Sequence, residues 1–378
     1  MEIFRLFNFL TLTQLKPLFS YLHGALFLPI SPQPKVQNME EWTRIDIDKF
    51  RARFEDLWSS YEDLFYSSGY TLWERRKSRS YEQVPPNKNP RAPDGFSYAM
   101  STEADKPWVS TSTKLHAART KDNRDVVIVL LSDGVRGISA TRSLEIVGRG
   151  LNAALFNNHT LPVLEWLRQD NLVFGVFPMV GRWYDLPWFG SIGNILEFMG
   201  QIIEGVAFLH EHHIAHRDLF FSNFVSSWRS ENEIPGGSDA LFRTRYYIID
   251  FEFAVCFAPD ADPETRVVTG PPVSFDVYER PAPPEMRKTA PYCPFKADVW
   301  QLGCAFLETF GHIEDIPLVI ELLMQMRNSD PAKRPTVQEA LDTLNQFRSS
   351  ISSDVIRVCV ERPDEALIEE EDYGYRVV

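Results

Sequence analysis

Cysteine is scarce in this sequence. The 378 residues include four cysteines, at positions 256, 293, 304 and 359, and no two of them form a CxxC pair. A small secreted scaffold held together by disulfides needs a much denser pattern. We therefore expect free thiols and a reducing compartment, cytoplasmic or nuclear.

Positive charge is also in deficit. Thirty-nine Lys and Arg residues stand against 52 Asp and Glu residues, which gives a formal net charge of −13. The phosphate backbone of a nucleic acid would be repelled by the molecule as a whole. We therefore expect no nucleic acid as a partner, and the sequence specifies no oligomeric state.

A long hydrophobic run is missing as well. The first thirty residues are apolar and aromatic, but Arg5, Lys16, Pro17 and His23 interrupt them. Because a helix that spans a bilayer needs about 20 consecutive, mostly apolar residues, we expect no stable membrane span. We interpret the segment as a docking or disordered extension, with a signal sequence or N-terminal membrane association as the alternative.

The sequence that is present divides into five segments. Residues 1–40 are an apolar extension and a Pro-containing linker, and 41–104 are a helical and irregular extension that packs on the main domain. Two extended runs around a polar turn at 121–124 predict a hairpin in a sheet-rich part, 105–178. Apolar spacing predicts helices at 192–210, 297–310, 316–326 and 337–347 within 179–350, and 351–378 form an acidic tail. The expected fold class is α+β.

The most specific signal is the sequence HRDLFFSN at 216–223. An HRD triplet followed at this distance by an asparagine resembles the catalytic loop of the eukaryotic protein kinase superfamily. The resemblance implies that Asp218 accepts the proton of the substrate hydroxyl and that Asn223 binds metal. It also implies that His216 and Arg217 brace this loop and the activation segment.

Further landmarks of protein kinases follow in family order. Asp250 resembles the Mg²⁺-binding aspartate of the DFG motif, although Glu252 stands in place of the glycine. Three further stretches resemble motifs of the family. They are APPE at 282–285, DVWQLG at 298–303 and DPAKRPT at 330–336. These matches imply that Asp298 holds the backbone of the HRD triplet and that Glu285 and Arg334 form a buried salt bridge.

The resemblance also suggests nucleotide contacts in the sheet-rich part. Glu145, on a helix predicted at 139–155, is the candidate for the glutamate that pairs with the phosphate-binding lysine. Val176, Phe177 and Met179 lie where the hinge of a kinase meets adenine, with Val176 as a small gatekeeper. The implied fold is bilobal, with a small antiparallel-sheet N-lobe and a larger, mainly helical C-lobe. The stretch at 70–73 resembles extensions of fungal members.

The family's lysine on the third strand is absent. Val129 occupies its place, and an apolar side chain cannot offset the charge of a triphosphate. The loop at 109–115 contains no glycine, and Phe220 stands where Ser/Thr kinases commonly carry a lysine. Lys114 lies close to the third glycine position, from which with-no-lysine kinases supply their phosphate-binding lysine. The alternative is that Lys114 is a solvated lysine on an edge hairpin.

Two functions follow from this mixture of retained and lost residues. One is a protein kinase that binds ATP and Mg²⁺ and transfers the γ-phosphate to Ser or Thr hydroxyls of proteins, weakly or atypically. The other is a pseudokinase that acts as a nucleotide-sensing or scaffolding module. A kinase-like phosphotransferase that acts on small molecules is disfavoured, because 282–285 and 330–336 resemble landmarks of protein kinases.

Overall fold

The computed structural model describes the residues 39, 42, 57–75, 82–89, 91–92, 108–110, 112–182, 189–227 and 244–360. They belong to one compact unit that begins at Asn38. The apolar N-terminal segment, its linker and the acidic tail beyond residue 360 lie outside the described residues. All four cysteines lie within them, and all four are free thiols as expected.

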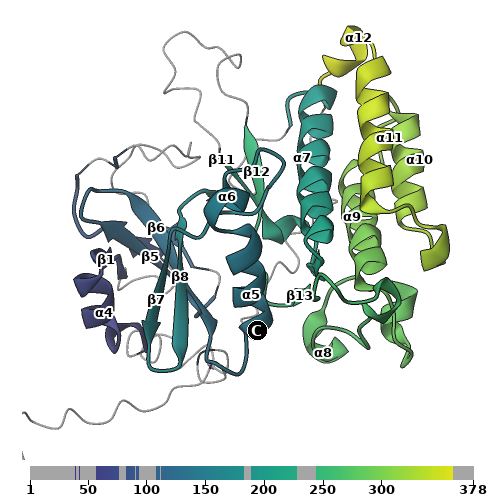
Figure 1. Ribbon diagram of the computed structural model, residues 1–378. Helices are drawn as coiled ribbons and strands as arrows, with labels where there is room; N and C mark the ends of the chain where they lie inside the picture. Colours follow the sequence, from purple (N-terminus) through teal and green to yellow (C-terminus); the bar gives the residue numbers. More distant parts are fainter. Residues whose placement is uncertain are drawn as a thin grey trace, which may run out of the picture. The chain divides into compact units, whose positions relative to one another are not determined.

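A five-stranded antiparallel sheet forms the first part of the fold (Figure 1). Its order is β1 (Tyr70–Leu72), β5 (Leu115–Thr120), β6 (Asp125–Ser132), β8 (Leu172–Pro178) and β7 (Glu165–Gln169). The hairpin predicted from the sequence is confirmed, since β5 pairs with β6 across a turn in which Asn123 adopts a left-handed φ of 62°. The first strand comes from the segment that the sequence analysis assigned to the extension.

An aromatic layer covers one face of this sheet. Its centre is Phe174 on β8, whose ring lies 5.2 Å from Phe65 and 5.9 Å from Trp58. Trp42 and Tyr61 complete the layer, and both are buried. Residues 57–59 are helical, and α4 (Glu62–Ser67) follows them, so the end of the predicted amphipathic segment packs its aromatic side against the sheet.

The opposite face of the sheet meets helix α5 (Ile138–Val147), which contacts β6 and the short strand β13 (Val255–Cys256). The helix predicted over 139–155 is interrupted, and α6 (Gly150–Ala153) continues after a break. Gly148 ends α5, where a Cβ atom would lie 2.8 Å from Leu144 O. A second sheet contains β2 (Glu74–Arg75), β3 (Glu82–Val84) and β4 (Trp108–Val109).

Helices dominate the second part. The predicted helices are confirmed as α7 (Ile192–Glu211), α9 (Pro294–Phe310), α10 (Pro317–Met326) and α11 (Val337–Ser350). Ser191 caps α7, and Thr336 with Glu339 forms a capping box on α11. Short elements complete it: α8 (Phe275–Tyr278), α12 (Ser353–Ile356), β9 (Gly181–Arg182), β10 (Ile214–Ala215), β11 (Phe224–Ser227) and β12 (Arg245–Ile248). The sheet and the helices confirm the α+β class.

Helix α7 lies between β12 on one side and α9 and α11 on the other, and it packs against all three (Figure 1). Within the described part of the chain, it alone is long and apolar enough to cross a membrane, and 72% of that window is buried. Its apolar residues are therefore used in the protein core, which accounts for their presence without a bilayer.

Candidate active site

The catalytic-loop candidate lies between β10 and β11, on backbone that one carboxylate holds. Asp298 on α9 accepts hydrogen bonds from the backbone N–H of His216 at 2.8 Å and of Arg217 at 2.7 Å. Arg217 has a φ of 68°, which is unusual for a residue other than glycine. The role implied for Asp298 is thus confirmed, and it fixes a strained turn that directs Asp218.

Asp218 is buried, and its carboxylate is only partly satisfied. The Asn223 amide donates to Asp218 Oδ2 at 2.7 Å and to its backbone oxygen at 2.8 Å, while Asp218 Oδ1 has no hydrogen-bond donor among the described residues. Burial raises the pKa of this carboxyl, and Asp250 adds to the effect. Arg280, His216 and Asn223 act in the opposite direction. A carboxylate oxygen without a donor is free to accept a proton, as a general base must.

This raised pKa predicts a stability gain on removing the charge. The pKa of this carboxyl is higher in the folded state than its ordinary value of 3.8. The ionised carboxylate therefore destabilises the fold, and the loss of stability grows as the pH rises from 3.8 through the raised pKa. Asp218→Asn should therefore increase the free energy of unfolding at pH 8, on the order of 1 kcal/mol. Urea unfolding should show this gain shrinking as the pH is lowered through the raised pKa toward 3.8. A gain that stayed constant down to pH 3.8 would contradict the assignment.

Asp250 lies directly beyond β12 and is tied to the same loop. The backbone N–H of Ile249 donates to Asn223 O at 3.0 Å, and His216 Nε2 lies 3.0 Å from Ile249 O. The ring of His216 also packs edge-on against Phe251 at 5.0 Å. Asp250 itself is exposed and has a φ of 63°. These contacts bring Asp218, Asn223 and Asp250 to one place.

The oxygen atoms at this place fit a magnesium ion. Because the Asn223 amide nitrogen is committed to Asp218, its Oδ1 remains available, with one long contact of 3.4 Å from the Ser222 hydroxyl. Asp250 adds an exposed carboxylate. No group of three or more His, Cys, Asp or Glu side chains converges in the described ranges. Mg²⁺ is commonly held by one or two carboxylates with substrate phosphates, so a sparse donor set is suitable.

Lys114 reaches this site from the turn before β5. Its ammonium nitrogen lies 2.7 Å from Glu252 Oε2, and the lysine side chain is only 11% exposed. Val129, one strand over, packs as a partly buried side chain against the main core. The sheet therefore offers a lysine at the Asp250–Glu252 segment even though the predicted position holds valine. The alternative of a solvated lysine on an edge hairpin is wrong, because the side chain is buried and paired.

The prediction for Glu145 is corrected by the structure. Its side chain is exposed, and the Trp166 indole N–H donates to Glu145 Oε2 at 2.6 Å. The face of α5 that turns inward carries Ala140, Ser143, Leu144 and Val147. Ser143 is fully buried, and its hydroxyl has no partner in the described part of the chain. The sequence distance chose the right helix but the wrong face of it.

Two of the predicted hinge residues are corrected as well. Val176 belongs to the cluster under the aromatic layer, whereas Phe177 joins the core cluster against which Val129 packs. Adjacent residues of a strand point to opposite faces, so Phe177, and not Val176, shares the face of Val129. The Met179 N–H donates to Asp125 O at 3.3 Å, and Met179 O accepts from Arg91 at 3.3 Å. Its backbone groups are therefore already used.

The buried salt bridge implied by the sequence is confirmed. Arg334 donates from both terminal nitrogens to Glu285, with Nη2 at 2.8 Å from Oε2. Both side chains are buried, and the arginine also donates to Asn328 O and Lys296 O. The bridge fastens the 282–285 motif to the turn that precedes α11.

Sequence reasoning missed Arg280, which approaches Asp218 from the segment before the 282–285 motif. No spacing rule marked it, because the contact depends on how α8 and the residues after it return to the catalytic loop. The sequence carried one signal, because Phe220 stands where Ser/Thr kinases commonly have a lysine. That substitution predicts a cation from another segment beside the catalytic loop.

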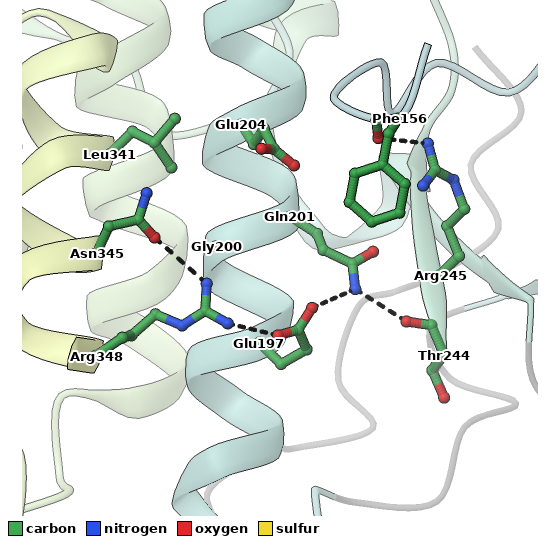
Figure 2. Close-up of a pocket in the computed structure, with 10 residues that line it drawn as sticks. All are labelled: Phe156, Glu197, Gly200, Gln201, Glu204, Thr244, Arg245, Leu341, Asn345 and Arg348. Carbon is green, nitrogen blue, oxygen red and sulfur yellow. Dashed lines mark hydrogen bonds and ion pairs between the residues drawn. The ribbon is translucent and has the colours of Figure 1, made fainter. Parts of the chain in front are cut away.

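A separate pocket lies away from these residues, between α7, α11 and β12 (Figure 2). Its volume is about 300 Å³, and one ion pair joins two of its lining residues. Arg348 contacts Glu197, and the Gln201 amide donates to Glu197 at 2.7 Å (Figure 2). Gly200 makes room for the arginine, since a Cβ atom there would lie 2.6 Å from Arg348 Nη1. We assign this pocket no chemistry.

Comparison with known proteins supports the resemblance seen in the sequence. Residues 191–318 match the protein kinase domain family. This stretch contains the catalytic loop, Asp250, the 282–285 motif and Asp298. These comparisons support the resemblance of this part of the chain to the eukaryotic protein kinase superfamily. The MAP kinase kinase kinase wis4 of Schizosaccharomyces pombe is 27% identical over 204 residues, 52% of this chain and 13% of that protein.

The residues that follow the kinase pattern and those that depart from it lie in different regions of the chain. Lys114, Val129 and Glu145 precede the matched residues, whereas Asp218, Asn223 and Asp250 lie within them. The sheet-rich part thus departs from the kinase pattern where the helical part keeps it.

Proposed function

We propose that this kinase domain binds MgATP between its sheet and its helical part, in a two-lobed arrangement, and transfers the γ-phosphate to Ser or Thr hydroxyls of proteins. The observation that carries the proposal is the convergence of Asp218, Asn223 and Asp250, with Lys114 brought to the adjacent Glu252. A decayed site would have no reason to keep these side chains together.

The chemistry of the step follows from the positions of the side chains. Asp218 accepts the proton of the substrate hydroxyl. The hydroxyl oxygen forms a bond to the γ-phosphorus of ATP, while the bond between that phosphorus and the oxygen that bridges it to the β-phosphorus breaks. The electron pair of the broken bond leaves with ADP. Mg²⁺, held by Asp250 and Asn223, offsets phosphate charge when bound. Asn223 orients the Asp218 carboxylate through the 2.7 Å hydrogen bond.

Lys114 is the phosphate-binding lysine in this proposal, in place of the residue lost at Val129. Glu252 holds its ammonium group beside Asp250 until phosphates compete for it. Because each incoming phosphate must replace that carboxylate, nucleotide binding should be weaker than in a site with a free lysine. This predicts slow or atypical transfer.

The second candidate is a pseudokinase that senses nucleotide or serves as a scaffold. The same ion pair favours it, since Glu252 brings negative charge to the place where phosphates would bind. The two candidates differ in whether MgATP binds and is turned over, and nucleotide binding is the first test.

Thermal unfolding with and without millimolar MgATP tests the proposal. A ligand at about 100 Kd stabilises by roughly 2.7 kcal/mol, so the midpoint should rise by a few degrees. Asp250→Ala and Lys114→Met should abolish the rise, while Lys121→Met, an exposed lysine of the neighbouring turn, should keep it. No rise at any ATP concentration would refute the enzyme and leave the scaffold.

A further inference from the structure

The site lacks a cation that this kinase superfamily commonly has. Phe220 stands two positions after Asp218, where Ser/Thr kinases carry a lysine that contacts the transferring phosphate, and its ring is buried. Lys114 does not fill this gap, because it pairs with Glu252. Unless another residue supplies a positive charge, the negative charges of Asp218 and Asp250 therefore face an incoming phosphoryl group without compensation.

Arg280 reaches the vacant position from the activation segment. Its guanidinium carbon lies 5.4 Å from the centre of the Phe220 ring, and its Nη2 donates to Ser222 Oγ at 2.6 Å. Its Nε lies 3.7 Å from Asp218 Oδ1, the oxygen with no hydrogen-bond donor in the described chain. Three contacts from one loop thus hold the arginine. The aromatic ring that replaces the lysine is also the surface on which the arginine stacks.

Several charged and titratable groups surround Asp218. The charged and titratable neighbours that affect Asp218 are Asp250, His216 and Arg280, and the Tyr278 hydroxyl lies in the same field. The Arg280 side chain is 31% exposed, so donors that Ser222 does not use can face an approaching substrate.

We propose that Arg280 supplies the positive charge that Ser/Thr kinases take from a lysine at the position of Phe220. Its guanidinium group holds the Asp218 carboxylate in place and brings positive charge to the transferring phosphoryl group. The activation segment thereby supplies part of the catalytic loop's charge. This role rests on the proposed phosphate transfer, whereas the contact with Asp218 can be tested without it.

Kinetics of transfer to a generic protein substrate test the role. Arg280→Gln should lower kcat about 10²-fold, the effect of removing one charge-stabilising donor, and leave KM for ATP nearly unchanged. Arg280→Lys should retain part of the activity.

Restoring a lysine at the family's position provides the sharper test. Adding Phe220→Lys to Arg280→Gln should recover at least tenfold of the lost kcat. Arg287→Gln is the matched control, since Arg287 stacks on Phe275 in the same segment but does not contact Asp218. A kcat for Arg280→Gln within twofold of the original, or no recovery in the double variant, would overturn the proposal.

A double-mutant cycle by thermal unfolding separates this proposal from the proposed function. At pH 8, Arg280→Gln should lower the midpoint in the Asp218 protein, and the loss should largely disappear in the Asp218→Asn background. If no phosphate transfer is found but the cycle shows this coupling, the enzyme proposal fails and the Arg280–Asp218 contact stands. Equal losses in both backgrounds would refute the contact itself.

Discussion

Replacing Arg334 with methionine is expected to lower the free energy of unfolding by about 3–5 kcal/mol. The arginine is 2% exposed, and it is bidentate to Glu285, which is also buried. The substitution leaves the Glu285 carboxylate without its cation and removes the donors to Asn328 O and Lys296 O. Urea unfolding followed by circular dichroism would measure the loss.

Arg124 is a suitable control, because it forms an ion pair with Asp122 in which both side chains are largely exposed. Exposed pairs contribute about 0–1 kcal/mol, so Arg124→Met should change the stability little. The Arg334 interpretation would be wrong if its substitution cost no more than the Arg124 control.

Asp298→Ala should weaken both the fold and the active site. The carboxylate is fully buried and accepts from the backbone N–H groups of His216 and Arg217, and His210 Nε2 lies 3.0 Å away. Each buried donor left without an acceptor costs about 1–3 kcal/mol, so we expect a loss of roughly 2–6 kcal/mol. The strained φ of Arg217 would lose its support, and the direction of Asp218 with it.

The unfolding midpoint of this variant should also show no rise when MgATP is added. Asp298→Asn should show an intermediate effect, because one acceptor oxygen remains while the amide places a donor beside a donor. Asp342→Ala on α11 is the control, since Asp342 is exposed and bonded only within its helix. Normal stability of Asp298→Ala would refute the bracing role.

The sequence was sufficient where function depends on short, contiguous motifs. The HRD loop, Asp250 and the Glu285–Arg334 pair were all identified from residue types in family order, and the hairpin at 115–132 followed from its turn. These features are local, or they are fixed by motifs whose partners lie in other motifs. Helix positions in the second part followed from apolar periodicity for the same reason.

The errors arose where orientation decides the role of a residue. Glu145 and Ser143 lie on the same helix, but only packing against β6 and β13 selects which face is buried. Val176 and Phe177 are neighbours on a strand, and a shift of one residue exchanges the two faces. Met179 lost its predicted role because Asp125 and Arg91 take up its backbone groups.

Pairing over long sequence distances was also out of reach. Strand β1 pairs with β5 between Tyr70 and Thr120, and nothing in either segment specifies the partner. Arg280 is the same kind of case, because its contact depends on the path of the whole activation segment. A distance along the chain says little about a neighbour that arrives from another element.

The aromatic layer around Phe174 sets a limit on how short this protein can be made. The family match begins at residue 191, and the predicted sheet-rich part begins at 105, yet Trp42, Trp58 and Phe65 cover the sheet from far upstream. A chain cut at 105 would lose β1 and expose a broad apolar surface to water, which favours aggregation. For expression and crystallisation, a stable fragment should therefore begin before Trp42.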